Sequence, residues 1–277
     1  MLTKNNWFNT TLRDRTLDRT AVFNTLISPY KFTPMDFDTA ADYTAQEIYK
    51  TYKKLYVSLS GGLDSEFVVR CLARNNIPFT PIIVICGNAE ESKYAFKVCK
   101  EINIEPIVIE VSEQELLEFF KTNIYRKFGG TGYNSSHNLI AAKYVYDLGD
   151  SYIVSGNHFL SDGFNKISDE EYFFAYEWDF YADYFLDKCI NINFYIYTLE
   201  LVYAAAPIYD TTWIEYKHRI FNLEFRNKLR HTYSKEIQDE LTKLVTQLSY
   251  VPRNVGEVWT KEQFFSYFNK YNLSLAL

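Results

Sequence analysis

Cysteine is scarce in this sequence, and its spacing fits neither a zinc site nor a disulfide framework. The four cysteines stand at positions 71, 86, 99 and 189, with no Cys-x-x-Cys pair and no matching histidine spacing. Structural zinc sites and disulfide-rich secreted domains both need such clusters. Cys71, Cys86 and Cys99 lie within apolar segments, so we expect buried, reduced thiols.

Long apolar runs and an excess of positive charge are also missing. No run of about 18 apolar residues occurs, and the first residues, MLTKNN, contain no apolar signal segment. The formal net charge of -6 gives no indication of a protein that wraps nucleic acid. We therefore expect a cytoplasmic protein with no membrane contact. Its 277 residues suffice for one large domain or one and a half.

The most informative segment is 60–65, SGGLDS, because its surroundings are those of a phosphate-binding loop. An apolar, β-branched stretch at 55–59 predicts a buried strand before it. An apolar stripe over 66–73 predicts an amphipathic helix after it. A tight turn between such a strand and helix points backbone N–H groups at one spot, where the helix dipole adds about half a positive charge.

The residue types in this loop suit pyrophosphate and a metal ion. Gly61 and Gly62 permit positive φ and the close approach of an anion to bare backbone. Ser60 and Ser65 supply hydroxyl donors, and Asp64 can hold a metal that bridges phosphate oxygens. No Gly-Lys-Ser/Thr sequence follows, so this is not a Walker loop. The alternative is a Gly-Gly turn without a ligand.

The hexapeptide matches the S-G-G-x-D-S loop of the PP-loop ATP pyrophosphatases, and residues 50–165 resemble this superfamily. The resemblance is greatest to the C-terminal domain of asparagine synthetases. It implies that ATP and Mg²⁺ are the cofactors and that the loop holds pyrophosphate. It places the nucleotide on Ser58, Ser60, Gly61, Gly62, Leu63, Asp64 and Ser65, with catalytic roles for Asp64 and Ser65.

Strand and helix patterns alternate from 50 to 156, which predicts an α/β fold with a doubly wound parallel sheet. Continuous apolar runs at 80–86 and 106–111 predict two further strands, and 152–155 predicts a fourth. Residues 112–115, SEQE, read as a capping box that opens a helix. The resemblance identifies this fold with the HUP or PP-loop type.

In such sheets a ligand binds at the carboxyl ends of the strands, where the strand order reverses. The resemblance implies that the first and fourth strands flank this point, which brings Gly156 and His158 next to the loop. Gly156 would let backbone approach the nucleotide, and His158 would contact phosphate or have no role. Asp162 is a candidate catalytic residue and second magnesium ligand, or else the acid of a solvated turn.

The same resemblance places adenine at the end of the second strand. Backbone N–H and C=O groups there can read the edge of the base. The residues concerned are Val84, Ile85 and Cys86. Their side chains are equally suited to the core, and the two roles are compatible.

We expect three parts along the chain. These are a helical extension over 1–50, the ATP-binding domain over 51–165, and an aromatic-rich helical region over 166–277 that covers the substrate side. Within the last part, 171–187 and 193–206 both look helical. The residues before the loop are too few for a glutaminase domain, so the resemblance implies ammonia taken free or from another chain.

Two further segments leave alternatives open. Residues 126–136 are rich in glycine and serine, and they form either a loop that closes over ATP or a plain connection. Arg219, Arg226 and Arg230 share one helix face, which is either solvated or a phosphate-binding surface. Nucleic acid is therefore not favoured as a partner, and homo-oligomerisation is left open.

The resemblance implies an ATP-dependent adenylating ligase without a glutaminase domain, similar to some phage-encoded proteins. Its partners would be ATP and a small-molecule acceptor, a carboxylate or amide that is activated for attack by ammonia or an amine. One alternative is a PP-loop enzyme that modifies tRNA or a nucleobase. Another is a non-catalytic ATP-binding module. Neither the acceptor nor the nucleophile is determined by the sequence.

Overall fold

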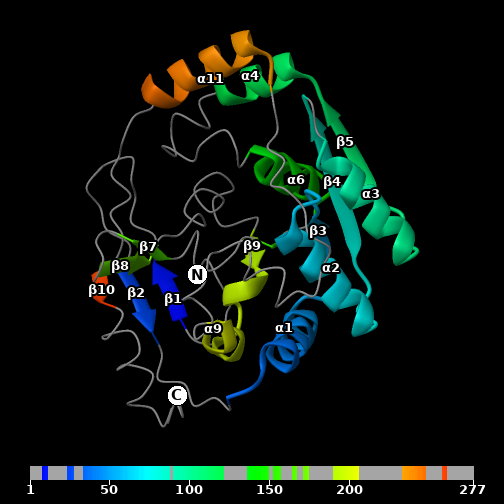
Figure 1. The fold of residues 1–277 in the computed structure, drawn as a ribbon, viewed down its shortest axis with the longest axis vertical. Coiled ribbons are helices and arrows are strands. Elements are labelled where there is room, and N and C mark those ends of the chain that lie inside the picture. The colour runs from blue at the N-terminus through cyan, green and yellow to red at the C-terminus, as the bar shows by residue number, and fades with distance from the viewer. Residues whose placement is uncertain are drawn as a thin grey trace.

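The computed structural model describes residues 8–11, 24–27, 34–87, 90–121, 136–149, 152–156, 164–166, 171–174, 190–205, 233–247 and 258–260. Its centre is a parallel sheet of five strands (Figure 1). These strands are β3 (Tyr56–Ser58), β4 (Thr80–Cys86), β5 (Ile107–Val111), β6 (Tyr152–Ser155) and β9 (Ile190–Asn193).

The strand order is β5-β4-β3-β6-β9, so the chain winds outward from β3 in both directions. The order reverses between β3 and β6, which pair directly at Val57 and Val154. Both the doubly wound α/β fold and the neighbouring position of the first and fourth predicted strands are confirmed. The loop at 60–65 follows β3 and therefore begins at this reversal point, where ligands bind in open α/β sheets.

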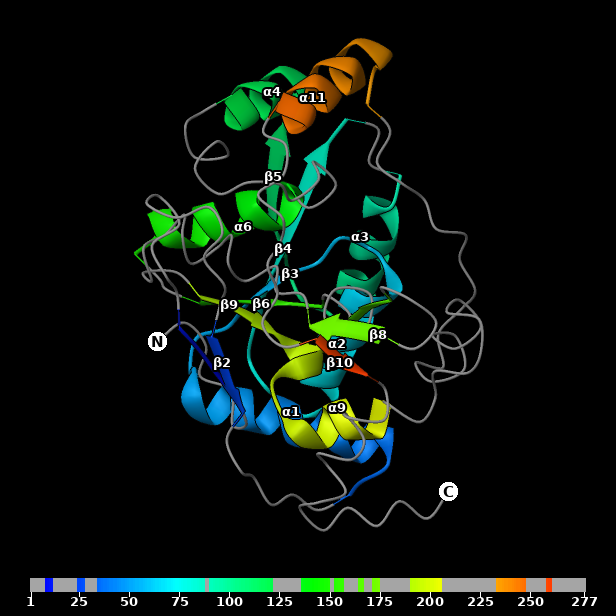
Figure 2. The same ribbon diagram turned by 90° about the vertical axis from the view of Figure 1, so that its left-hand side faces the viewer.

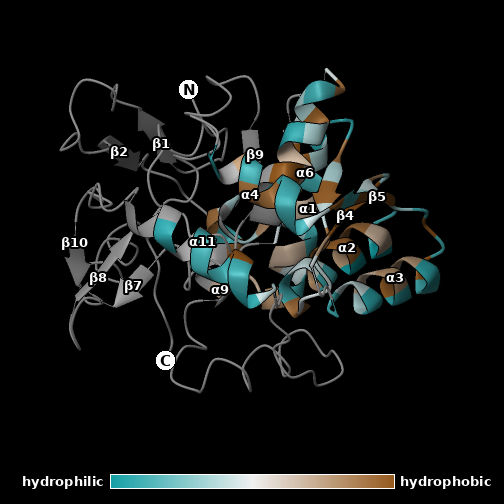
Figure 3. Ribbon diagram, turned by 90° about the horizontal axis from the view of Figure 1, so that it is seen from above, coloured by the Kyte–Doolittle hydropathy of each residue, from teal (hydrophilic) through white to brown (hydrophobic). Residues whose placement is uncertain are grey.

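Helices cover both faces of the sheet (Figures 1 and 2). The described helices are α1 (Phe37–Thr51), α2 (Leu63–Arg74), α3 (Ser92–Glu101), α4 (Glu113–Lys121), α6 (Ser136–Asp147), α9 (Leu199–Ala205) and α11 (Lys235–Gln247). Of these, α9 packs against α1 and α11 packs against α4. In Figure 3, α2, α3 and α11 each carry hydrophobic and hydrophilic residues, as expected of helices with one packed face.

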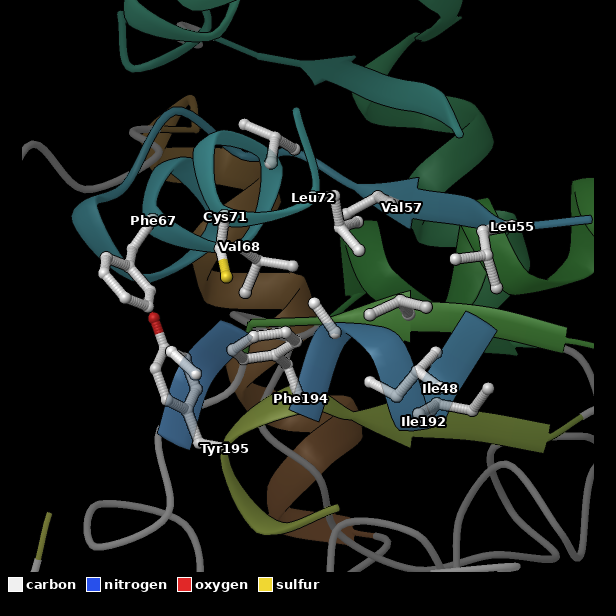
Figure 4. Close-up of a cluster of buried hydrophobic side chains, with 14 of the residues drawn as sticks. Ile48, Leu55, Val57, Phe67, Val68, Cys71, Leu72, Ile192, Phe194 and Tyr195 are labelled. Carbon is white, nitrogen blue, oxygen red and sulfur yellow. The ribbon is translucent and has the colours of Figure 1, made fainter. Parts of the chain in front are cut away.

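Alternate residues of the strands enter two separate hydrophobic clusters, because successive side chains of a strand point to opposite faces. Val57 and Val154 pack with residues of α1, α2 and α3 (Figure 4). Tyr56 and Ile153 pack on the other face with residues of α6, α4 and α11. The expected amphipathic helix near the N-terminus is α1, which contributes Ile48 and three alanines to the first cluster.

The first fifty residues contain strands as well as the predicted helix. β1 (Phe8–Thr11) and β2 (Asn24–Ile27) form an antiparallel pair. The pairing partners are 13 to 19 positions apart, with Thr11 opposite Asn24 and Phe8 opposite Ile27. Strands of four residues show too little alternation to be identified from the sequence.

The prediction of a helix over 171–187 is wrong where the structure describes that segment. Glu171–Phe174 is a strand, β8, between β7 (Phe164–Lys166) and β10 (Val258–Thr260) in an antiparallel sheet. Its aromatic residues suit a strand as well as a helix. The pairing with β10 joins residues more than 80 positions apart, so no local pattern reveals it.

The prediction of a helix over 193–206 is correct only in its second half. Asn193 ends the strand β9, and its side-chain Oδ1 accepts from the Tyr195 N–H at 3.1 Å. A short 3₁₀ helix, η2 (Phe194–Ile196), follows, and α9 begins at Leu199. The central sheet therefore takes its fifth strand from the region expected to be helical.

The predicted capping box is confirmed at the start of α4. Glu115 N–H donates to the Ser112 Oγ at 3.2 Å, and both the Ser112 N–H and its hydroxyl donate to the Glu115 carboxylate at 2.7 Å. These hydrogen bonds hold the pKa of Glu115 below its ordinary value. Farther along the chain, the Ser234 N–H and hydroxyl donate to the Glu113 carboxylate, which ties the start of α11 to α4.

The cysteines within the described residues are buried and unpaired, as predicted. Burial raises the pKa of the Cys86 and Cys99 thiols to about 11, and that of Cys71 still further. Cys189 lies outside the described residues. In the described part of the chain, no helix has both the length and the apolar character needed to cross a membrane.

A buried hydroxyl pair links α1 to the segment after β9. Thr44 and Thr198 are fully buried, with their Oγ1 atoms 2.5 Å apart. Thr44 also contacts the Ala40 carbonyl at 2.8 Å. We predict that Thr198→Val lowers the free energy of unfolding by about 1–3 kcal/mol, because it breaks the hydroxyl pair and removes the Thr198 Oγ1 that accepts from the Leu201 N–H at 3.4 Å.

The control is a double-mutant cycle measured by urea denaturation. We expect Thr44→Val with Thr198→Val to cost clearly less than the sum of the single changes, because each single change already removes the hydrogen bond between the two hydroxyls. Strict additivity would show that the two hydroxyls do not interact.

Candidate functional site at the start of α2

The loop at 60–65 leads directly into α2, and the helix start has no side-chain cap. Gly62 is the N-cap residue. The first hydrogen bond within the helix runs from the Glu66 N–H to the Gly62 carbonyl at 3.1 Å. The preceding N–H groups have no acceptor within the helix, and the positive end of the helix dipole lies at the same place. This combination is suited to bind an anion.

The two serine hydroxyls of the loop form a closed ring of hydrogen bonds. The Gly62 N–H donates to the Ser60 Oγ at 3.2 Å, and the Ser65 hydroxyl donates to the Gly62 carbonyl at 3.0 Å. The Ser60 and Ser65 Oγ atoms are 3.2 Å apart. Because a hydroxyl has only one proton, Ser60 is the donor in this pair. The ring fixes the loop, and each hydroxyl can turn to an arriving anion.

Of the two loop glycines, only Gly61 has a backbone conformation that requires glycine. Its φ is +94°, and a Cβ there would lie 2.0 Å from the Glu91 carbonyl oxygen at the start of α3. Gly62 has φ −72°, and the nearest atom to a Cβ would be the Ser60 Oγ at 3.4 Å. Of the two features that glycine permits here, positive φ occurs at Gly61 and not at Gly62. For Gly62 the close approach of an anion to bare backbone stays a prediction.

Gly156, at the end of β6, packs directly against the first turn of α2. A Cβ on Gly156 would lie 2.8 Å from the Ser65 Cα and 2.9 Å from the Asp64 carbonyl carbon and oxygen. All these atoms belong to backbone, so nothing flexible could move aside. The structure therefore confirms that Gly156 lies next to the loop. The close approach that it permits is to the loop backbone, while its approach to a nucleotide stays a prediction.

Tyr195, in η2, also contacts this peptide, and the sequence analysis missed it. Its hydroxyl donates to the Asp64 carbonyl at 2.9 Å. The sequence places Tyr195 only in an aromatic-rich region, and nothing local distinguishes it from neighbouring tyrosines. The contact depends on β9 lying beside β6, which is a feature of the sheet order.

β4 extends beyond its pairing with β3, and the adenine prediction concerns this end of the strand. β3 pairs with β4 only from Thr80 to Ile82, and the Leu59 N–H donates to the Ile82 carbonyl at 2.9 Å. β4 continues to Cys86, paired on its other side with β5. Since backbone polar groups of a strand alternate between its two sides, those of Val84 and Cys86 face the space beyond β3.

The side chains at this strand end belong to the core. Val84 and Cys86 lie in the cluster with α6, and Ile85 packs against the cluster with α2. Only backbone could therefore read a base here, and the two roles given to these residues are compatible.

Ser58 and Ser155 end the two strands that flank the reversal point, and both are buried. The Ser58 hydroxyl donates to the Asn138 Oδ1 of α6 at 2.7 Å, so its side chain is engaged with a helix and not with the loop. The Ser155 Oγ has no hydrogen-bond partner among the described residues. Asn138 has no recognisable motif around it in the sequence, which is why its contact was missed.

Of the two acidic residues predicted to hold metal, Asp64 lies within the described residues. Asp64 lies in the first turn of α2, next to the loop, and is partly exposed. Asp162 and His158 lie outside the described residues, as do the basic face around Arg226 and most of the segment 126–136. No group of three or more possible metal-ligating side chains occurs among the described residues. One carboxylate next to a phosphate loop still fits Mg²⁺, which commonly binds one or two carboxylates together with substrate phosphates.

Comparison with known proteins supports the resemblance to PP-loop enzymes. Residues 49–141 match the family model described as asparagine synthase, a segment that contains the loop, α2 and the first three strands of the sheet. No curated protein matches the chain.

Similar solved structures include an NMN synthetase from Francisella tularensis (12% identity, TM-score 0.37), covering 78% of this chain and 94% of that one. An NH3-dependent NAD synthetase from Campylobacter jejuni has 21% identity and a TM-score of 0.36, with coverage of 77% and 94%. A predicted subunit of a tRNA methyltransferase from Methanocaldococcus jannaschii has 17% identity and a TM-score of 0.35, with coverage of 76% and 98%. Similarity at this level carries no conclusion about function.

The different environments of the two loop glycines give opposite predictions for alanine. Gly61→Ala should destabilise the protein by more than about 2 kcal/mol, because it adds strain at positive φ to a backbone collision. Gly62→Ala should fold, with its free energy of unfolding lowered by less than about 1 kcal/mol. It should bind Mg–ATP more weakly, because a methyl group enters the proposed anion site. Thermal denaturation and calorimetry with Mg–ATP measure both effects. Wild-type affinity in Gly62→Ala would place the phosphates elsewhere.

Proposed function

We propose that this chain, whose residues 49–141 carry an asparagine synthase-type PP-loop domain, is an ATP-dependent adenylating ligase. It would convert ATP to AMP and pyrophosphate while activating a carboxylate or amide oxygen of an acceptor. Ammonia or an amine would then displace AMP. The observation that carries the proposal is the position of the SGGLDS loop, which lies at the reversal point of the sheet and at the uncapped start of α2.

The loop is suited to receive pyrophosphate as it leaves. N–H groups at the helix start and the hydroxyls of Ser60 and Ser65 would donate to the β- and γ-phosphate oxygens. The serine ring and Gly156 would hold the loop backbone before the reaction, so its N–H groups need little reorganisation as negative charge develops on the leaving group. The two hydroxyls would turn from the ring toward the phosphate oxygens. Asp64, with Asp162 as a second candidate, would hold Mg²⁺, which neutralises charge on the phosphates.

The open end of β4 supports a place for adenine at the opposite end of the site. Backbone groups of Val84 and Cys86 would read the edge of the base, and the ribose would bridge from there toward the carboxyl end of β3. The nucleotide would then cross the reversal point, with its α-phosphate near Gly156. The acceptor would approach the α-phosphate in line with the pyrophosphate leaving group.

The test is pyrophosphate release from Mg–ATP against a panel of amino acids and other carboxylates with ammonia, with small RNAs as a further set. Release that depends on a small acceptor and ammonia supports the ligase. Release that depends only on RNA would instead identify an RNA-modifying enzyme. ATP binding without release under any condition would identify a binding module and contradict the proposal.

Asp64→Asn tests the metal ligand within this proposal. It removes a negative charge at nearly constant volume, so we expect a normal fold and a loss of pyrophosphate release on the order of 100-fold or more, equivalent to several kcal/mol. Asp147→Asn is the matched control, because Asp147 is an exposed carboxylate on α6 that pairs with Lys143. Full activity in Asp64→Asn would remove Asp64 from the site.

A further inference from the structure

The peptide between Asp64 and Ser65 contacts two segments that come later in the chain. A Cβ on Gly156, the residue after β6, would lie 2.8 Å from the Ser65 Cα. The Tyr195 hydroxyl, in η2, donates to the Asp64 carbonyl at 2.9 Å. A peptide unit is planar, so fixing this carbonyl also fixes the direction of the Ser65 N–H in the same plane. That N–H is among those with no acceptor within α2.

Tyr195 itself has little freedom to move. Its side chain is 1% exposed and lies parallel to the Phe67 ring, with ring centroids 6.2 Å apart and an interplanar angle of 25°. Figure 4 shows its hydroxyl beside Phe67, on the side facing α2. The Tyr195 N–H is bound by Asn193, the last residue of β9. Position and direction of the hydroxyl are therefore set by the sheet and by α2 together.

We infer that Tyr195 is a positioning residue for pyrophosphate, and this inference rests on the proposed function. Its hydroxyl orients the Asp64–Ser65 peptide so that the Ser65 N–H points into the loop, and it touches neither substrate nor metal. Through this contact β9 and η2 set the geometry of an anion site that is otherwise built from residues 60–65. The alternative is a buried tyrosine whose hydroxyl has merely found an acceptor.

Tyr195→Phe removes only the hydroxyl and keeps the ring on Phe67. Tyr197→Phe is the matched control, because Tyr197 lies two residues away, is also buried, and donates its hydroxyl to the Thr51 Oγ1 at 3.2 Å, away from the loop. Each change deletes one buried hydrogen bond, so the two variants should lose similar stability. Only the hydrogen bond of Tyr195 reaches the loop.

The experiment is calorimetric titration of the full-length wild type and both variants with inorganic pyrophosphate and Mg²⁺, with Mg–ATP, and with AMP. We expect Tyr195→Phe to bind pyrophosphate and ATP about three- to ten-fold more weakly, the factor that one net hydrogen bond corresponds to. AMP lacks the β- and γ-phosphates, so its affinity should not change. Tyr197→Phe should stay within about two-fold of wild type for all three ligands, a change smaller than one net hydrogen bond.

Wild-type affinity for pyrophosphate in Tyr195→Phe would overturn the inference and leave the proposed function intact. The inference would also be overturned if pyrophosphate binding weakened equally in both variants, or if binding of AMP and pyrophosphate weakened equally in Tyr195→Phe. Either result would show a general loss of stability. A wild-type protein that binds neither ATP nor pyrophosphate would instead contradict the proposed function itself.

Discussion

Backbone meets backbone at the first turn of α2, and the site depends on that contact. Gly156 can approach the Asp64–Ser65 peptide only because it has no side chain, and Gly61 can lie against the Glu91 carbonyl for the same reason. A methyl group at either place would collide with main-chain atoms. The loop is therefore enclosed by the start of α3 and the end of β6, with its uncapped N–H groups directed to the carboxyl edge of the sheet.

The sheet order explains why these segments meet. A doubly wound sheet that reverses between β3 and β6 leaves the end of each strand beside the other, so a loop after β3 and a glycine after β6 become neighbours. The fifth strand, β9, continues the same series and brings η2 to α2. Hydrophobic packing on the two faces keeps this arrangement, since Val57 and Val154 are fully buried under α1 and α2.

The contacts of η2 with the rest of the molecule connect regions that are distant in the sequence. Tyr195 reaches Asp64, Tyr197 reaches Thr51, and Thr198 reaches Thr44. All three are hydrogen bonds from buried side chains, for which the loss of one partner is costly. The segment after β9 is therefore tied both to α1 and to the loop.

The sequence by itself determined the elements whose signals are local. The strands β3, β4 and β5, the helix α2, the capping box at Ser112 and the loop at 60–65 all follow from periodicity, capping and turn chemistry within short windows. The likeness of the loop to a known family added the reversal point between the first and fourth strands. Local residue chemistry is enough for these features because each depends mainly on its immediate neighbours along the chain.

Only the tertiary structure decided which glycine has no room for a side chain, where β8 and β9 lie, and what holds the Asp64 carbonyl. The obstacle to a side chain at Gly61 is the carbonyl of Glu91, thirty positions away, and the hydroxyl on Asp64 comes from a residue 131 positions away. The strand β8 lies between β7 and β10, and its pairing with β10 joins residues more than 80 positions apart. Such contacts depend on the packing of the whole sheet, so a short stretch of sequence does not predict them.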